Sequence, residues 1–151
     1  MAAKSPVIMV MVNDLGSWNV PEHLLAKGCR TVLDSEGIRG GEISITLLDD
    51  EGIMVLNQEY FGENSPTDVI AFALYESGEP VLGDIYLGFE QAKRQASELD
   101  VPLYEELLRL VIHGTLHVLG HEHSDGANRV QSEMFLKQEE LLRSVLEPGS
   151  G

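Results

Sequence analysis

One stretch of the chain, residues 103–119, is apolar on nearly every side of the helix that it predicts. Asp100 and Pro102 precede it, as is common at the start of a helix. The apolar positions are Leu103, Leu107, Leu108, Leu110, Val111, Ile112, Leu116, Val118 and Leu119. A helix of this kind is buried inside a domain, so other elements must cover it. A chain of 151 residues is long enough to supply them.

Four further segments predict strands. Residues 7–12 form a continuous apolar run, typical of a strand buried on both faces, and we place it centrally in the sheet. Residues 43–47 alternate between apolar and polar side chains, as in a strand with one buried face. Residues 69–74 and 81–87 are joined by a turn-rich stretch, which favours antiparallel pairing of the two segments.

The remaining segments predict four more helices. They begin after a cap at Asn19, after a cap at Asp49 or Asp50, at Phe89, and after a cap at Asp125. The resulting order predicts an α+β fold, with a small mixed β-sheet of about four strands covered by helices and the histidine-bearing helix buried. No linker or repeat divides the sequence, so we expect a single domain over 1–151, with flexible tails at 1–5 and 148–151.

The charge of the chain is strongly negative. There are 25 acidic and 10 basic residues, and no basic residue stands between Arg39 and Lys93. The electrostatic field of such a chain repels polyanions and is poorly suited to nucleic-acid binding through Lys and Arg. We expect most of the acidic residues to lie on a face exposed to solvent. No apolar run approaches the roughly 20 residues that span a bilayer, and a secretory signal is not evident, so we expect a cytoplasmic protein. The single cysteine, Cys29, predicts a small buried side chain.

Histidines supply the chemical signal. His113 and His117 are four residues apart on the predicted helix, so both imidazoles can reach one metal ion. Gly120 suits the left-handed position that ends a helix, and the chain can then turn so that His123 approaches the same ion. His121 competes as third ligand, but on a continued helix it would lie about 12 Å from His113 along the axis. We therefore predict a metal site of His113, His117 and His123.

Three imidazoles suit one Zn²⁺ ion, and nickel, copper and iron remain open. Such a set leaves a coordination position for water, and zinc lowers the pKa of that water from about 15.7 to about 7. The site then supports hydrolysis. The alternatives are surface or capping histidines, or a closed structural site with Glu122 or Asp125 as the fourth ligand.

The histidine spacing also matches that of the metzincin peptidases, H-E-x-x-H-x-x-G-x-x-H, with one difference. Gly114 stands where those enzymes have the glutamate that acts as general base. A peptidase mechanism would lack its proton acceptor here. A zincin-type metallopeptidase is therefore the second hypothesis.

The block His113-Gly-Thr-Leu-His-Val-Leu-Gly-His-Glu-His123 resembles the YbeY family of bacterial ribosomal-RNA endoribonucleases. Further matches are Leu56-Asn57 with Tyr60, the stretch 66–72, and the stretch 82–85. The resemblance implies a zincin-like fold, zinc held by His113, His117 and His123, and single-strand-specific cleavage in small-subunit ribosomal RNA maturation and ribosome quality control. It also implies ribosomal RNA, the small ribosomal subunit and an Era-type GTPase as partners. From the lack of a long apolar run we expect no membrane partner.

The sequence departs from the family pattern at one functional position. An arginine and a basic loop normally follow the helix tyrosine, whereas this chain has Phe61 and then Gly62-Glu63-Asn64-Ser65. The phosphate-binding cation is missing. Arg109, one helical turn before His113, is our candidate substitute, and its alternative role is pairing with Glu105 or Glu106.

The proton-transfer groups are left open by the sequence. Asp68, Asp84, His121 and Glu122 can each act as general acid or base, and we select Asp84, Glu122 and Arg109 as candidate catalytic residues. Asp68 can instead cap a turn, and Asp84 can instead orient a ligand histidine. Attack by a metal hydroxide and attack by the 2′-hydroxyl of the RNA are both possible.

Three functions follow in order of preference. The first is a zinc-dependent endoribonuclease, whose substrate rests on the family resemblance. The second is the metallopeptidase. The third is a non-catalytic ribosome-assembly factor whose zinc stabilises the fold.

Overall fold

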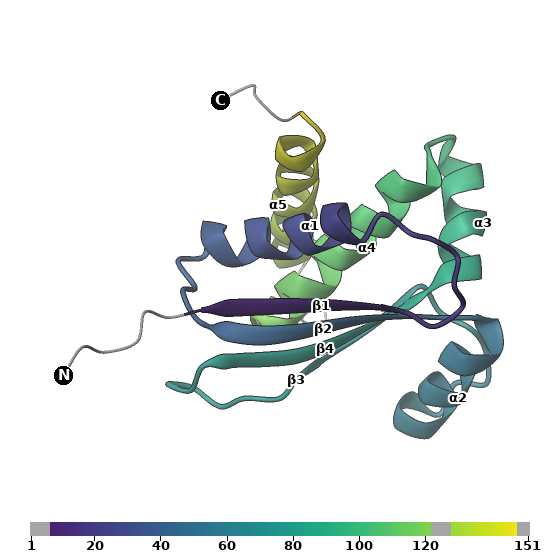
Figure 1. Ribbon diagram of the computed structural model, residues 1–151, viewed down its shortest axis with the longest axis horizontal. Helices are drawn as coiled ribbons and strands as arrows, with labels where there is room; N and C mark the ends of the chain where they lie inside the picture. Colours follow the sequence, from purple (N-terminus) through teal and green to yellow (C-terminus); the bar gives the residue numbers. More distant parts are fainter. Residues whose placement is uncertain (1–6, 122–127, 148–151) are drawn as a thin grey trace.

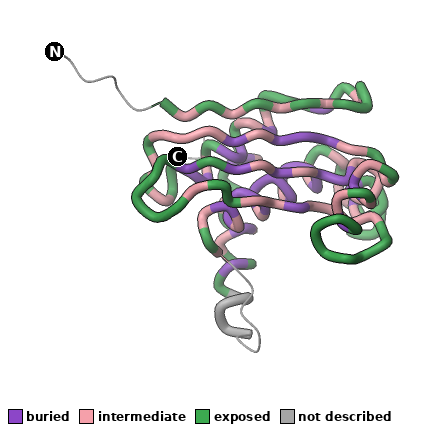
Figure 2. Tube along the Cα trace, turned by 90° about the horizontal axis from the view of Figure 1, so that it is seen from below, coloured by how far each residue is buried: buried purple, intermediate pink, exposed green. Residues whose placement is uncertain are grey.

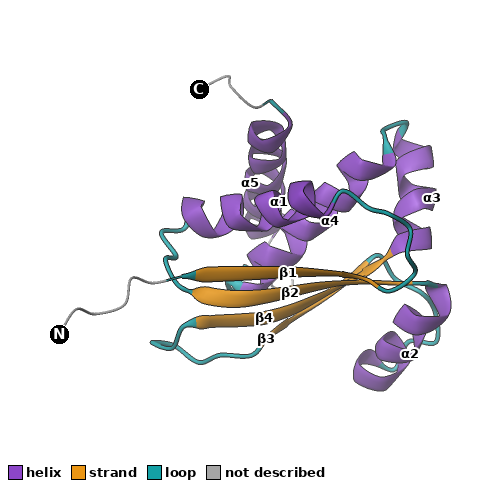
Figure 3. Cartoon of the chain, in the orientation of Figure 1, coloured by secondary structure: helices purple, strands orange, loops and turns teal. Residues whose placement is uncertain are grey.

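The computed structural model describes the backbone of residues 7–121 and 128–147, and the side chains of residues 7–121 and 133–147. The two predicted tails, 1–5 and 148–151, lie outside these ranges. Nine elements follow one another in the predicted order, which confirms the α+β class (Figure 3). They are β1 (Ile8–Asp14), α1 (Glu22–Ser35), β2 (Gly41–Leu48), α2 (Asp50–Phe61), β3 (Val69–Ala73), β4 (Val81–Gly88), α3 (Phe89–Leu99), α4 (Leu103–Val118) and α5 (Asn128–Leu146).

Helix boundaries agree with the predicted caps in one case and differ in two. The Asp49 side chain accepts a hydrogen bond from Gly52 N at 2.7 Å and caps α2, as predicted. Pro21, not Asn19, is the N-cap of α1, and Asn19 has a φ of +61°. Asp100, expected to open α4, instead ends α3 in the left-handed conformation. Short polar side chains suit both ends of a helix, so the residue type alone does not tell them apart.

The four strands form one mixed sheet in the order β1-β2-β4-β3. β1 pairs with β2, and β2 with β4, in parallel. β3 pairs with β4 antiparallel, which confirms the pairing predicted for residues 69–74 and 81–87. The sheet therefore has the parallel strand β1 at one edge and the antiparallel strand β3 at the other.

The prediction that residues 7–12 form a central strand is wrong. β1 is an edge strand, and its burial alternates along its length. Met9 is 51% exposed and Met11 is 42% exposed, while Val10 between them packs against the core. Apolar side chains occur on open sheet faces as well as inside, so an unbroken apolar run did not distinguish the two.

A layer of helices covers one face of the sheet (Figure 1). In the view of Figure 1, α1, α4 and α5 lie above the strands, and α2 lies below them beyond one end. Ile43, Ile45 and Ile85 from the sheet are fully buried with Leu108 and Ile112 from α4. Figure 2, seen from below, shows buried stretches along the strands. Side chains alternate between the two faces of the sheet along β4, so Leu82, Asp84 and Tyr86 lie on the face opposite to α4.

Two further expectations concerned Cys29 and the apolar helix α4. Cys29 has no exposed surface, and burial raises the pKa of its thiol to about 11, which confirms the small buried side chain. Within residues 7–121 and 128–147, no helix is long and apolar enough to cross a membrane, including the apolar helix α4.

Candidate metal centre

Two histidines of α4 meet at their ring nitrogens. His113 Nε2 and His117 Nε2 lie 3.0 Å apart, and the ring centroids are separated by 4.6 Å. Helical geometry brings residues four apart onto one face, which is why both imidazoles point to one place. Both side chains are half-buried, on a helix whose other faces are packed into the core. The pair thus presents two ring nitrogens that could bind the same metal ion.

The spacing of these nitrogens fits a shared ion. Two imidazole nitrogens bound tetrahedrally at about 2.0–2.1 Å from zinc are about 3.3 Å apart. The observed 3.0 Å is close to that value, so both donors can bind one zinc ion after a small ring movement. The third predicted ligand, His123, lies outside the described residues, as do Glu122 and Asp125. Among the residues that are described, no group of three His, Cys, Asp or Glu side chains is placed to hold a metal.

A pocket of about 350 Å³ opens beside the histidine pair. It lies at the edge strand β3, with α4 on one side and the end of α2 on the other. Its lining residues are Asn57, Phe61, Thr67, Val69, Ile70, Ala71, His113 and His117. No basic side chain is among these lining residues of the described structure. The family motif around Leu56-Asn57 and the histidine block, far apart in sequence, therefore share one cleft.

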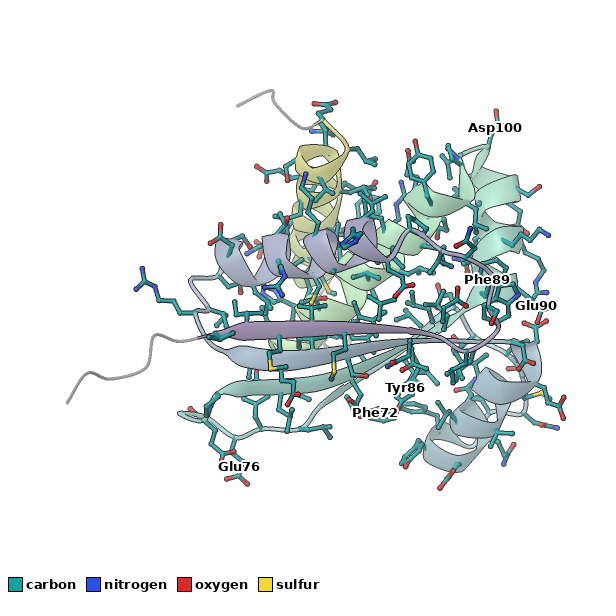
Figure 4. All side chains as sticks on the ribbon, viewed as in Figure 1. Phe72, Glu76, Tyr86, Phe89, Glu90 and Asp100 are labelled. Carbon is teal, nitrogen blue, oxygen red and sulfur yellow. The ribbon has the colours of Figure 1, made fainter. Side chains whose placement is uncertain are left out.

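Aromatic side chains fix the end of α2 against the sheet. The rings of Tyr60 and Phe61 lie 5.0 and 6.4 Å from that of Phe72, and Phe72 meets Tyr86 edge-on at 6.1 Å. Figure 4 shows Phe72 and Tyr86 on the side of the sheet that faces α2. Asn57 is buried and donates to Ser65 O at 2.9 Å, which ties the loop after α2 to the helix. These contacts place Phe61, where the family resemblance leads us to expect an arginine, in the wall of the pocket.

Gly120 ends α4 as predicted. Its φ is +98°, its N–H bonds His117 O at 2.9 Å, and His121 N bonds Leu116 O at 3.0 Å. The chain then turns, and His121 Nε2 lies 2.9 Å from Glu36 Oε1, next to α1. Hydrogen bonds from His121 and Lys137 hold the pKa of Glu36 below its usual value. His121 thus has a partner away from the His113–His117 pair.

Of the predicted acidic candidates, Asp68 has a structural role in the described part of the chain, and Asp84 has a position that separates it from the pair. Asp68 Oδ1 accepts hydrogen bonds from Val69 N at 2.8 Å and from the Thr67 hydroxyl at 3.4 Å, so it caps the turn before β3. Asp84 lies on the sheet face opposite to α4, because its neighbour Ile85 points to that helix. The suggestion that Asp84 orients a ligand histidine is therefore wrong for His113 and His117.

Arg109 is held by carboxylates. Its guanidinium lies 2.5 Å from Glu106 Oε1, 2.9 Å from Glu139 Oε2 and 3.5 Å from Glu105 Oε2. Of the two roles that the sequence left open, the structure shows the pairing. Burial alone would raise the pKa of Glu139, but the hydrogen bonds from Arg109 and Gln138 outweigh it and lower that pKa. Arg109 does not line the pocket, so it is a poor replacement for the missing cation.

Gln138 is a candidate site residue that the sequence reasoning missed. It is 6% exposed, and its Oε1 lies 2.6 Å from His113 Nδ1. A signal was present, since Gln138 falls on the apolar stripe of α5 that carries Met134, Leu142 and Val145. A polar residue on a buried stripe needs a hydrogen-bond partner, and here that partner is a candidate metal ligand.

Gly114 sits where α4 comes closest to the sheet. A Cβ atom added at Gly114 would lie 2.9 Å from Ile85 Cγ2 and 3.3 Å from Val69 Cγ2. The position is fully enclosed, and it faces β3 and β4 instead of the pocket. The glutamate that the metzincin pattern requires has no room at this position.

Comparison with known proteins places the chain in a family. The family model described as "Endoribonuclease YbeY" matches residues 14–146. The chain belongs to the YbeY family. A relative from Persephonella marina, named Endoribonuclease YbeY, is 34% identical over 90% of this chain and 92% of its own length. Another relative of that name, from Bacillus licheniformis, is 41% identical over 82% and 86%.

A solved relative agrees with the fold. The solution structure of a Thermotoga maritima protein superposes with a TM-score of 0.61 at 26% identity, covering 96% of this chain and 99% of that one. The YbeY family match confirms the resemblance stated from the histidine block. The matched range 14–146 also includes the segment 56–61, so Phe61 lies within the matched region.

Proposed function

We propose that this chain is a zinc-dependent endoribonuclease that cuts single-stranded ribosomal RNA during maturation and quality control of the small ribosomal subunit. The observation that carries the proposal is the pair of imidazole nitrogens 3.0 Å apart at the wall of a pocket, on a YbeY-family chain. His113, His117 and His123 would hold the ion. By family resemblance we propose the small subunit and an Era-type GTPase as partners, and the cytoplasm as location.

The chemistry divides between the ion and the chain. When bound, zinc with an open position polarises a phosphoryl oxygen and makes water a nucleophile near neutral pH. His113 and His117 would hold the ion from α4, a helix that is largely buried in the core. The edge strand β3 and Phe61 form the wall along which an RNA strand would lie. Glu122 stays a proposed proton-transfer group, and Asp84 stays a weaker one because it is on the opposite sheet face.

One observation favours a second function. The described pocket lining has no Lys or Arg, and the chain carries a net charge of −15, so electrostatic attraction for RNA is weak. A non-catalytic assembly factor, with zinc stabilising the fold, would need no phosphate-binding cation. It is supported if the zinc-loaded wild type leaves RNA intact while loss of zinc lowers its melting temperature.

Phe61→Arg is expected to strengthen binding and cleavage of RNA, because it restores a cation in the pocket wall. The added phosphate contact should steepen the dependence of log affinity on log salt by about 0.7, the value for one contact to a single strand. The measurement is binding and cleavage of a single-stranded ribosomal RNA fragment at several salt concentrations, with zinc and with a chelator.

Val55→Arg is the matched control. Val55 is 58% exposed on the same helix and does not line the pocket. The Val55→Arg substitution therefore adds the same charge outside the pocket. We expect a smaller gain from Val55→Arg than from Phe61→Arg, and loss of cleavage by every variant in the chelator. Cleavage that persists in the chelator would rule out the zinc-dependent enzyme. Equal gains from the two variants would rule out RNA binding at this pocket.

A further inference from the structure

A continuous line of hydrogen bonds runs from His113 into the helical layer. Gln138 Oε1 is 2.6 Å from His113 Nδ1, and Gln138 Nε2 donates to Glu139 Oε2 at 3.1 Å. Arg109 Nε donates to the same Glu139 oxygen at 2.9 Å. His113 therefore has Gln138 as its partner, and Gln138 in turn is held by Glu139.

The chemistry of Glu139 fixes which way the Gln138 amide points. An ionised carboxylate only accepts hydrogen bonds, so the group that Gln138 turns to Glu139 must be its NH₂. The amide oxygen must then face His113, and an oxygen can only accept. It follows that His113 Nδ1 carries the proton and that its lone pair is on Nε2, the atom 3.0 Å from His117 Nε2.

Arg109, which donates to Glu139, is itself held in place by Glu106. Arg109 also donates to Glu106 Oε1 at 2.5 Å, and Gln95 Nε2 donates to Glu106 Oε2 at 2.9 Å. Glu106 and Gln138 are 2% and 6% exposed, so water competes little for these bonds. The network joins α3, α4 and α5, and a rotation of the Gln138 amide would break at least one buried bond.

We propose that Gln138, held by Glu139 and Arg109, is a positioning residue that keeps His113 in the Nδ1–H tautomer with Nε2 ready to bind metal. The inference deepens the proposed function, because it concerns the ligand set of the same site. Arg109 keeps Glu139 ionised and in place, and Glu105 and Glu106 in turn hold Arg109. Outer hydrogen-bond partners of this type raise the basicity of a ligand histidine and are worth about 10–100-fold in metal affinity.

The direct test is the tautomer of His113, read from histidine ring ¹⁵N shifts in the full-length, metal-free protein. In wild type we expect a protonated Nδ1 and an unprotonated Nε2. Gln138→Leu removes the acceptor, and we expect His113 to populate both tautomers. Glu139→Ala leaves Gln138 in place but frees its amide to rotate, so a mixture of tautomers is expected there too.

Glu140→Ala is the matched control, since Glu140 is the exposed neighbour of Glu139 on α5 and loses the same charge. We expect Glu140→Ala to keep the wild-type tautomer. Because Gln138→Leu can also disturb packing, Glu139→Ala gives an independent reading with the amide retained. An Nε2–H tautomer in wild type, or an unchanged His113 in both Gln138→Leu and Glu139→Ala, would overturn the proposal.

Zinc affinity, measured by competition with a chelator, supplies the second readout. Gln138→Leu should weaken zinc binding about 10–100-fold and Glu139→Ala about 10-fold, with Glu140→Ala unchanged. Neither readout uses RNA, so a chain that cuts no RNA would contradict the proposed function and leave this inference standing. Equal zinc affinity in wild type and Gln138→Leu would contradict the inference alone.

Discussion

His117→Ala is expected to abolish zinc binding and, with it, RNA cleavage. The side chain supplies one of two nitrogens that already lie 3.0 Å apart, and alanine leaves His113 without its neighbouring donor. Loss of a ligand should weaken zinc binding by more than about 100-fold, since even an outer partner is worth about 10–100-fold. Zinc content by atomic absorption after dialysis, and cleavage of single-stranded RNA by the same sample, measure both effects.

His23→Ala is the control for this variant. His23 is exposed on α1, well separated from the pair in sequence, and its loss removes a histidine without touching the pocket. The control should keep the zinc content and cleavage of wild type. Cleavage of equal strength in all three preparations would mean that a contaminating nuclease produces it. Full zinc content in His117→Ala would show that His117 is not a ligand.

Gly114→Glu is expected to prevent stable folding and to yield no peptidase. The new side chain would have to enter a space where even a Cβ atom lies 2.9 Å from Ile85 Cγ2. Its carboxylate would be buried without a partner, at a cost of several kcal/mol, against a total stability of about 5–15 kcal/mol. Circular dichroism with urea titration, and a casein cleavage assay on any folded protein, measure the outcome.

Gly114→Ala separates the steric part of this effect. Alanine favours a helix over glycine by about 1 kcal/mol, so an unhindered site would become more stable. Overpacking of this kind costs about 1–3 kcal/mol, and we expect it to reverse that gain. Tyr104→Glu, at an exposed position in the first turn of the same helix, should be nearly neutral. A folded Gly114→Glu protein that cleaves casein would revive the peptidase hypothesis.

Much of the fold was predictable because periodicity reports burial directly. Residues 103–119 have apolar side chains on nearly every side of a helix, and this predicted the buried helix α4. Alternation of apolar and polar residues along 43–47 predicted β2, a strand with its inner face in the core. The edge position of β1 was not predictable in this way. Its exposed methionines look the same in sequence as buried ones, and strand order depends on long-range pairing that a local pattern does not contain.

The candidate site was predictable where helical spacing alone decides it. His113 and His117 meet because they are four apart on α4. Gln138 arrives from α5, and Arg109 pairs with Glu139 across the same two helices, so both facts needed the packing of α4 on α5. Asp84 required knowing which sheet face the helices cover, which no single strand reveals.

X-ray absorption at the zinc edge of the purified full-length protein tests the central claim most directly. We expect one zinc ion per chain with three imidazole nitrogens at about 2.0–2.1 Å and one oxygen completing a tetrahedral set. A fourth donor from the protein, or fewer than three imidazoles around the ion, would contradict an open catalytic centre built on His113, His117 and His123.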